Sequence, residues 1–273
     1  MGIKKQIEKA QELLEGFEVP LLPEAALKLQ KLFNESAMPS PKKVKDLIAM
    51  NPFLAGELVS LANIPSLSNT VGIIIKDLDS AIYRLGNKRL KNYILSIYVK
   101  KIISEYQVNG LSYHSQDIAL IASQIARFNK YVSPDEAYLL GLLHDIGGFA
   151  LTEIDPHYGD DFIKNQFKYL SMSKYEEATF GTTHAALGYL IAQSWNVPNY
   201  ISQTILLHHI HSIDLIENTK LRSLISTIEL AHSISNIKNH KNKASGEAKN
   251  IYEKCKHILD ISDDELYEIL QAS

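Results

Sequence analysis

The sequence is poor in cysteine and has no long apolar run. Its only cysteine, Cys255, excludes an intramolecular disulfide and a cysteine-rich zinc site. No stretch of about 18 apolar residues occurs, and lysines at 91, 100 and 101 interrupt the most apolar long segment, residues 90–103. We therefore expect no membrane span. The N-terminus also lacks an apolar signal region, so we expect a cytoplasmic protein.

An excess of one charge sign is also missing. The 273 residues include 28 Lys and Arg against 31 Asp and Glu, a formal net charge of −3, and 45% are hydrophobic. This balance makes nucleic-acid binding an unlikely main function. We interpret Lys88, Arg89 and Lys91 as a solvated helix face. A chain of this length can bury one large core or two of ordinary size.

Almost every segment has helical rather than strand periodicity, so we predict an all-α protein. The most informative helix is expected to begin at Ser133, where Pro134 suits the first helical position and Glu136 completes a capping box. We expect Gly147 and Gly148 to end it.

A histidine and an aspartate, His144 and Asp145, stand near the expected end of that helix. Gly141 lies one turn before Asp145 and would let another helix approach the carboxylate closely. An imidazole and a carboxylate among leucines and glycines would be costly to bury without partners. Further histidines on other expected helices could supply such partners: His114, His184, His208 and His209. Each alone is more typical of a core or surface residue, but the ordered set favours a metal site.

These motifs together resemble the HD superfamily of metal-dependent phosphohydrolases. More closely, the chain resembles the HDOD family, a regulatory branch of that superfamily found in bacterial signalling. The matching motifs extend from about residue 17 to 237 and include Leu22-Pro23, Asn51-Pro-Phe-Leu54, Leu61-Ala-Asn63, Ala81-Ile-Tyr-Arg-Leu-Gly86, Gly141-Leu-Leu-His-Asp-Ile-Gly147, Phe180-Gly181, His184 with Gly188, Trp195 before Pro198, and His208-His209.

The resemblance implies an N-terminal helical bundle packed on an HD-like helical lobe. We expect the first lobe to span residues 1–108 and the HD-like lobe, with a candidate metal cleft, to span residues 109–238. Residues 239–273 are expected to form a mobile loop, over 239–250, and a C-terminal helix packed on the body. The loop is polar and lysine-rich and has almost no large apolar residues.

The resemblance also implies a divalent metal, with iron, manganese, zinc and magnesium as candidates. A site without metal is the alternative. The candidate ligands are His114, His144, Asp145, His184 and His208. Weaker candidates, as substitute ligands or as residues that orient a ligand, are His209, His232, Glu177 and Glu229. Glu177 could equally be a helix-surface residue.

The chain departs from the catalytic relatives at three positions. Those that hydrolyse cyclic dinucleotides carry a lysine where Gly148 stands, and an acidic residue where Ile210 follows the histidine pair. The late aspartate of HD enzymes has its place near Glu229 or His232. Phosphodiester hydrolysis needs a metal-activated water and a cation for the developing phosphate charge. That cation is not evident here.

We therefore expect a non-catalytic signalling module that binds a protein partner or a small signal. Two alternatives stay open. One is a metal-dependent phosphohydrolase acting on a nucleotide or phosphodiester. The other is a helical scaffold whose histidines are structural.

Overall fold

The structure is a computed structural model of the 273-residue chain and describes residues 2–36, 39–68, 72–105, 110–165, 169–210, 212–240 and 246–272. In these ranges all regular structure is helical, which confirms the all-α prediction. Within them no helix has both the length and the apolar character to cross a membrane. The α-helices are α1 (Ile3–Leu14), α2 (Glu24–Glu35), α3 (Pro41–Ala49), α4 (Pro52–Ala62), α5 (Leu78–Leu85), α6 (Leu90–Glu105), α7 (Leu111–Ile125), α8 (Pro134–Leu143), α9 (Ile146–Ile154), α10 (Tyr158–Asn165), α11 (Tyr169–Phe180), α12 (His184–Ser194), α13 (Asn199–Leu207), α14 (Thr219–His240), α15 (Gly246–Leu259) and α16 (Asp263–Ala272).

Two helix starts follow the capping boxes in the sequence. At α8, the side chain of Ser133 caps the helix while its backbone N–H donates to Glu136 at 3.0 Å. At α16, the backbone N–H of Ser262 donates to Glu265 at 2.8 Å. Each box satisfies N–H groups that have no partner within the helix, so these sequence signals fix where the two helices begin.

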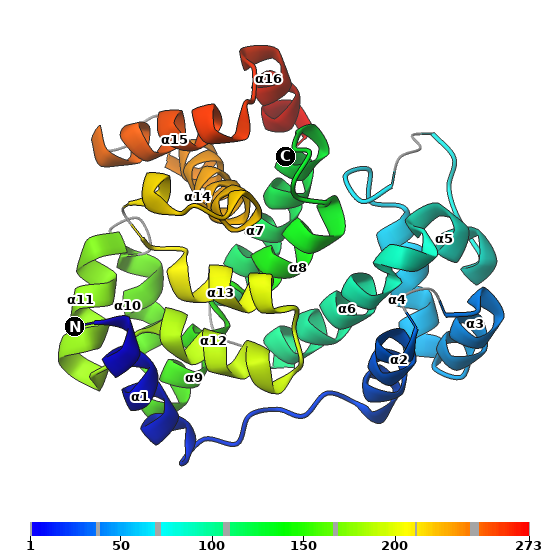
Figure 1. Cartoon of the computed structure of the whole chain (residues 1–273), viewed down its shortest axis with the longest axis horizontal. Coiled ribbons are helices and arrows are strands. Elements are labelled where there is room, and N and C mark those ends of the chain that lie inside the picture. Colours follow the sequence, from blue (N-terminus) through cyan, green and yellow to red (C-terminus); the bar gives the residue numbers. More distant parts are fainter. Residues whose placement is uncertain are drawn as a thin grey trace.

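Helix α6 joins an N-terminal bundle to the HD-like lobe. The helices α2 to α5 gather on one side of the molecule, and α6 runs from them toward α8 (Figure 1). Side chains on every face of α6 are buried, among them Tyr93, Ile94 and Leu95. A helix buried all round packs against two partners at once, and α6 contacts α2 and α4 on one side and α8 on the other.

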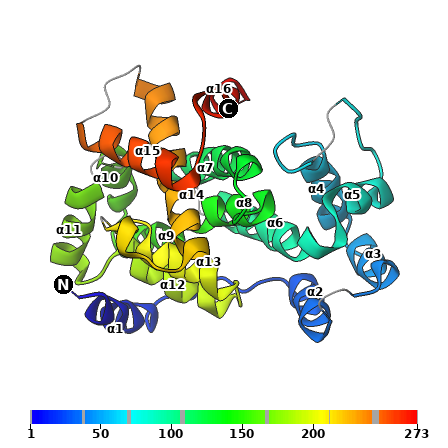
Figure 2. The same cartoon turned by 45° about the horizontal axis from the view of Figure 1, so that its top comes forward.

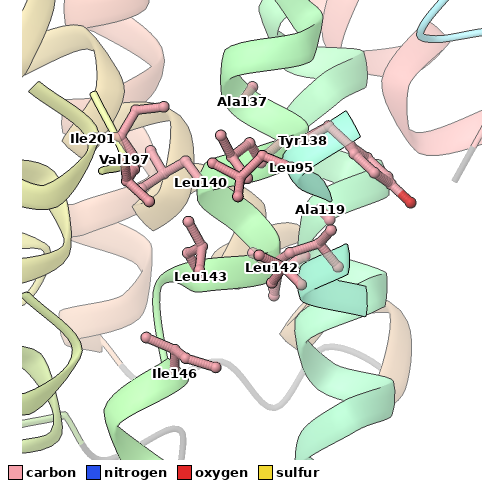
Figure 3. Close-up of a cluster of buried hydrophobic side chains, with 14 of the residues drawn as sticks. Leu95, Ala119, Ala137, Tyr138, Leu140, Leu142, Leu143, Ile146, Val197 and Ile201 are labelled. Carbon is pink, nitrogen blue, oxygen red and sulfur yellow. The ribbon is translucent and has the colours of Figure 1, made fainter. Parts of the chain in front are cut away.

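Helix α8 lies at the centre of the HD-like lobe, and each of its residues is buried. Its apolar side chains meet Leu95 from α6, Ala119 from α7 and Ile201 from α13 (Figure 3). Gly141 allows the closest of these approaches, because a Cβ at that position would lie 2.4 Å from Cα of Ala119. Packing on all sides fixes the direction of α8 and, with it, the placement of the residues at its two ends.

Helix α1 does not join the N-terminal bundle, in contrast to the expected lobe of residues 1–108. It lies against α12 of the HD-like lobe, at the opposite side of the molecule from α2 (Figures 1 and 2). The carbonyl of Gln6 accepts a hydrogen bond from Thr182 at 2.7 Å, and its side-chain amide donates to Glu177 at 2.5 Å. The extended segment that follows α1 carries the chain back to α2, so sequence order does not match spatial order here.

The expected helix end at Gly147 and Gly148 is wrong, because α9 runs through both glycines. The chain turns earlier, at His144 and Asp145, between α8 and α9. A Cβ at Gly147 would lie 2.0 Å from the carbonyl oxygen of His184 and 2.5 Å from the backbone nitrogen of Gly188. Gly147 is thus required where α9 and α12 cross, rather than as a helix stop.

The segment predicted as a loop, residues 239–250, is largely helical where it is described. Helix α14 continues to His240, α15 begins at Gly246, and residues 241–245 lie outside the described part of the chain. From Ile251 onward, Cys255 and Leu259 follow at intervals of four and are buried on one face of α15. This apolar stripe packs α15 on α14 and accounts for a helix that local polarity concealed.

Candidate metal centre

The structure brings together the candidate ligands from several helices. His114 lies in the first turn of α7, His144 ends α8, and Asp145 precedes α9. His184 opens α12, where Thr183 caps the helix. The remaining donors come from the end of α13 and from α14: His208, His209 and His232.

The carboxylate of Asp145 lies at the middle of this cluster. Its Oδ2 is 2.8 Å from Nε2 of His144 and 3.4 Å from Nε2 of His114. Its Oδ1 is 3.3 Å from Nε2 of His184 and 3.5 Å from Nε2 of His208. Each oxygen of one buried carboxylate therefore faces its own set of imidazoles.

Two groups of possible ligands share Asp145. One contains His114, His144 and His232, and the other contains His184, His208 and His209. In each group the donor atoms lie within 4.8 Å of one another. A carboxylate shared by two such groups is able to bridge a pair of metal ions.

Backbone carbonyls orient two of the rings. Nδ1 of His144 lies 2.7 Å from the carbonyl oxygen of Gly141, and Nδ1 of His208 lies 2.6 Å from that of Ile205. A carbonyl oxygen only accepts, so each Nδ1 carries the proton. The Nε2 atom of both rings then faces Asp145, on the side from which a metal ion would be bound.

Glu176, which sequence reasoning did not select, orients His184. Its carboxylate lies 2.7 Å from Nδ1 of His184 and accepts the backbone N–H of the same residue at 2.9 Å. The hydroxyl of Tyr158 donates to it at 2.6 Å. A carboxylate on the far nitrogen fixes the ring and raises the basicity of Nε2, as carboxylates behind metal-bound histidines do.

The neighbouring Glu177 does not approach the cluster. It accepts a hydrogen bond from Gln6 of α1, so of the two open readings the surface contact is the one present. Helical spacing could have distinguished the two glutamates. Glu176 lies four residues after the buried Met172 and four before Phe180, which packs on the core.

The spacing of the Nε2 atoms fits shared metal ions. Nε2 of His184 is 3.4 Å from that of His208 and 3.0 Å from that of His209, and those of His144 and His232 are 3.1 Å apart. Two lone pairs at such distances repel unless a proton or a cation lies between them. Nitrogen ligands about 2.0–2.1 Å from one tetrahedral zinc ion are about 3.3 Å apart. These three nitrogen pairs are thus spaced much as ligands of one ion would be.

The electrostatics favour positive charge at the centre. Burial alone would raise the pKa of Asp145, but the surrounding imidazoles, His144 foremost, hold it well below its usual range. Burial alone would lower the pKa of His184, but Glu176 and Asp145 raise it to about 10. A bound cation would interact with Asp145 and Glu176, the carboxylates that otherwise stabilise the proton on His184.

Neutral imidazoles surround the carboxylate of Asp145. Burial lowers the pKa of His208, and it lowers the pKa of His209 and His232 well below the usual value. These rings are therefore neutral at pH 7. Neutral rings offer the lone pairs that a metal ion needs.

Of the two expected substitutes for the late aspartate, His232 lies within a donor group and Glu229 does not. Oε1 of Glu229 lies 3.8 Å from Nδ1 of His209, behind the cluster. Burial, together with the charge of Asp145, raises the pKa of Glu229 to about 8. At neutral pH this carboxyl group is largely protonated and so adds little negative charge to the site.

An aromatic side chain from α10 covers the cluster. The ring of Phe162 lies 5.7 Å from that of His184 and 6.3 Å from that of His114, centre to centre, and it is itself buried. Gly148, which the resemblance aligns with a lysine of catalytic relatives, also packs against side chains. A Cβ there would lie 3.3 Å from Leu111 and 3.6 Å from Tyr158.

Comparison with known proteins establishes the family. The HDOD domain matches residues 19–211, most of the chain. The protein therefore belongs to the HDOD domain family, in agreement with the resemblance found in its motifs.

Solved structures share the fold at low sequence identity. An HDOD domain protein of unknown function from Geobacter sulfurreducens superposes with a TM-score of 0.68 at 22% identity, covering 99% of this chain and 98% of that one. A Shewanella amazonensis protein, provisionally described as a metal-dependent phosphohydrolase, gives 0.66 at 17% identity, covering 97% and 99%. A Marinobacter aquaeolei protein, provisionally described as a signal transduction protein, gives 0.57 at 17% identity, covering 99% and 65%.

A curated relative is longer than this chain. An uncharacterized protein of Treponema pallidum is 23% identical in an alignment of 209 residues that covers 70% of this chain. The chain spans 38% of the length of that relative.

Proposed function

We propose that this HDOD protein is a regulatory module that holds divalent metal in a covered centre and acts by binding a protein partner or a small signal, without catalysis. The observation that carries the proposal is the combination of a complete donor cluster around Asp145 with the ring of Phe162 lying over it. The cluster supports metal binding, and its cover opposes access by a phosphodiester.

The donor set favours some metals over others. Imidazole suits zinc and iron, whereas magnesium prefers oxygen ligands and keeps several waters. Each group here has three histidines and shares one carboxylate. Replacement of the late aspartate by His232 moves the set further from magnesium. Zinc and iron are therefore the favoured ions, with manganese next. When bound, such an ion would supply Lewis acidity, and the chain's own residues position it by fixing ring tautomers and excluding water.

Hydrolysis lacks support from the surroundings of the cluster. A hydrolase needs a cation for the developing phosphate charge, and position 148 is a glycine packed against Leu111 and Tyr158. Phe162 also packs on one ring of each donor group, His114 and His184, which narrows the approach of a substrate. Loss of one charge-stabilising group typically costs about 100- to 1000-fold in rate.

The competing function is a metal-dependent phosphohydrolase, and the observation that favours it is the donor cluster itself. The Shewanella protein of the same fold carries that provisional description. This alternative requires a path for substrate past the buried rings of the donor groups.

A hydrolysis panel separates the two functions. Cyclic dinucleotides, nucleoside triphosphates and a simple phosphodiester are incubated with protein supplied with zinc, iron or manganese, and Asp145→Ala serves as the control. We expect no turnover above background. Metal-dependent turnover above about 0.1 per second that Asp145→Ala abolishes would establish the hydrolase instead, since median enzymes reach about 10 per second.

A further inference from the structure

A wide cavity in the described part of the chain lies away from the metal centre. It has a volume of about 860 Å³ and opens where the start of α6 meets the start of α8. Its other walls are the segment that follows α7 and the residues Tyr200 and Lys220. We call it the basic cleft, because six of its lining residues are lysine or arginine: Lys88, Arg89, Lys91, Arg127, Lys130 and Lys220.

Two carboxylates in the basic cleft are already paired within the protein. Asp135 lies 3.4 Å from Arg89 and accepts a hydrogen bond from Asn92 at 2.7 Å. Glu136 accepts from Lys220 at 2.5 Å and from the hydroxyl of Tyr200 at 2.9 Å. These acids therefore leave the other cations of the cleft uncompensated. In the described ranges, no carboxylate lies within 4.0 Å of the amino or guanidinium nitrogens of Lys88, Lys91, Arg127 and Lys130.

This surplus stands out against the rest of the molecule. The whole chain carries a net charge of −3, yet the basic cleft has four cations without an anionic partner among the described residues. Like charges that converge on one concave surface repel one another and focus a positive potential. An anion bound between them would relieve that repulsion. The sequence interpretation of Lys88, Arg89 and Lys91 as a solvated helix face is incomplete, because they line this cavity.

We propose that the basic cleft binds a small phosphate-bearing molecule of nucleotide size. Its volume falls within the range of small-molecule sites, about 300–1,000 Å³. Arginine and lysine are the side chains that bind phosphate best. Tyr131, 44% exposed beside Lys130, offers a flat face on which a base could stack. Ligand phosphates placed among the cations and a base placed on Tyr131 would occupy both kinds of surface.

A ligand in this position would connect the two lobes. Lys88 and Lys91 belong to the α6 side, whereas Arg127 and Lys130 follow α7 in the HD-like lobe. Phosphate bound between them would hold the lobes together. That such a ligand acts as a signal rests on the proposed regulatory function. The basic cleft would then be the site at which the small signal binds. The basic cleft also touches the start of α8, which ends about 15 Å away at the metal centre.

Isothermal titration calorimetry with three probes tests the proposal: inorganic pyrophosphate, GDP and ATP, each without added metal. The variant Lys88→Glu/Lys130→Glu reverses two exposed cations of the cleft. The control Lys5→Glu/Lys43→Glu makes the same charge change at exposed positions elsewhere. We expect at least one probe to bind with a Kd below about 1 mM. We also expect the cleft variant to weaken that binding at least tenfold and the control to change it less than twofold.

Three results would overturn the proposal. One is no binding of any probe up to about 5 mM. Another is equal weakening in both double variants, which would indicate a non-specific charge effect. The third is tighter binding of a single-stranded RNA oligonucleotide than of any probe through the same lysines. Circular dichroism melts confirm that both variants fold. Metal content and hydrolysis report on the other end of α8, so a failure here leaves the proposed function to its own tests.

Discussion

The two ends of α8 handle buried charge in opposite ways. At its start, the carboxylates of Asp135 and Glu136 are paired with Arg89 and Lys220, and positive charge remains in excess around them. At its end, Asp145 is surrounded by imidazoles whose Nε2 atoms face one another at 3.0–3.4 Å. The carboxylates at the start of α8 have cationic partners within the protein, and the cavity there has room for an anion. The cluster at its end is complete only when a proton or a metal ion joins it.

This difference shows how one helix, packed on all sides, can position two different sets of side chains. At the start of α8, which we call the open end, the carboxylates are paired. Solvent and small molecules can therefore enter without leaving a buried charge unpaired. The end of α8, which we call the closed end, is largely buried, so its donors depend on one another and on any ion bound between them. Substitutions should therefore act locally at the start of α8 and cooperatively at its end.

The largest expected effect concerns packing at the closed end. In Gly147→Ala the added Cβ would meet backbone atoms of His184 and Gly188 that cannot move aside. We expect a loss of at least about 3 kcal/mol in the free energy of unfolding, at the upper end for overpacked cores. Urea denaturation measures it.

The control for this prediction is Gly56→Ala in α4, where no atom lies within 4 Å of the added Cβ. Alanine in a helix interior is expected to stabilise the protein by about 0.5–1 kcal/mol. A tolerated Gly147→Ala would show that the closed end is less tightly packed than described, and the contrast between the two ends would fail.

Asp145→Asn tests the cooperativity of the closed end. The substitution keeps the size of the side chain and removes the charge shared by both donor groups. We expect the metal content of both donor groups to fall together, by at least tenfold. The matched control is Asp135→Asn at the other end of α8, which should leave metal content unchanged. Elemental analysis measures both variants, and loss of only one of two bound ions in Asp145→Asn would refute a shared bridge.

The adjacent glutamates of α11 offer a sharper comparison. Glu176→Gln removes the negative partner of His184, and metal affinity should weaken about 10- to 100-fold, as for other carboxylates behind a histidine ligand. Glu177→Gln alters the contact with Gln6 of α1, outside both donor groups, and should leave affinity unchanged. Competition with a chromophoric chelator measures both affinities. Equal effects of the two substitutions would mean that Glu176 acts through general charge rather than by orienting His184.

The smallest expected effect lies at the open end. Burial alone would raise the pKa of Glu136, but the hydrogen bonds from Lys220, Ser133 and Tyr200 bring it below its ordinary value of 4.5. A lowered pKa in the folded state contributes stability above pH 4.5, and that stability is lost as pH falls through the folded value. Glu136→Gln should therefore destabilise the protein by about 1 kcal/mol at pH 7 and progressively less below pH 4.5.

Urea melts of wild type and Glu136→Gln at several pH values measure this difference. The control is Glu8→Gln, whose exposed partner Lys4 lies 4.0 Å away, and it should change stability by less than about 0.5 kcal/mol. A constant difference across the pH range would exclude the ion pair with Lys220 as its source. Metal content should be the same in all three proteins.

Local signals in the sequence predict much of this molecule. Periodicity identifies an all-helical chain, and the capping box at Ser133 locates the start of α8. The order of His114, His144 and His184 identifies side chains that the fold brings together. Such features depend on a few neighbouring residues or on motif order, so a single sequence reveals them.

What the sequence misses depends on helix register and long-range contact. The spacing of Met172 and Phe180 places Glu176, not Glu177, on the buried face of α11, but only the fold shows that Glu176 meets His184. Gly147 resembles a helix stop because its requirement comes from α12, distant in sequence. The basic cleft combines residues near 88, 130 and 220, and no local pattern indicates that they meet.

The most direct test of the account is the metal content of the wild-type protein. The protein is purified without chelator, and half is reconstituted with iron, manganese or zinc before exhaustive dialysis and elemental analysis. The account predicts between about one and two tightly bound ions per chain, with zinc or iron preferred over magnesium. Fewer than about 0.1 ions per chain in every preparation would contradict it. The histidines around Asp145 would then be a protonated structural network.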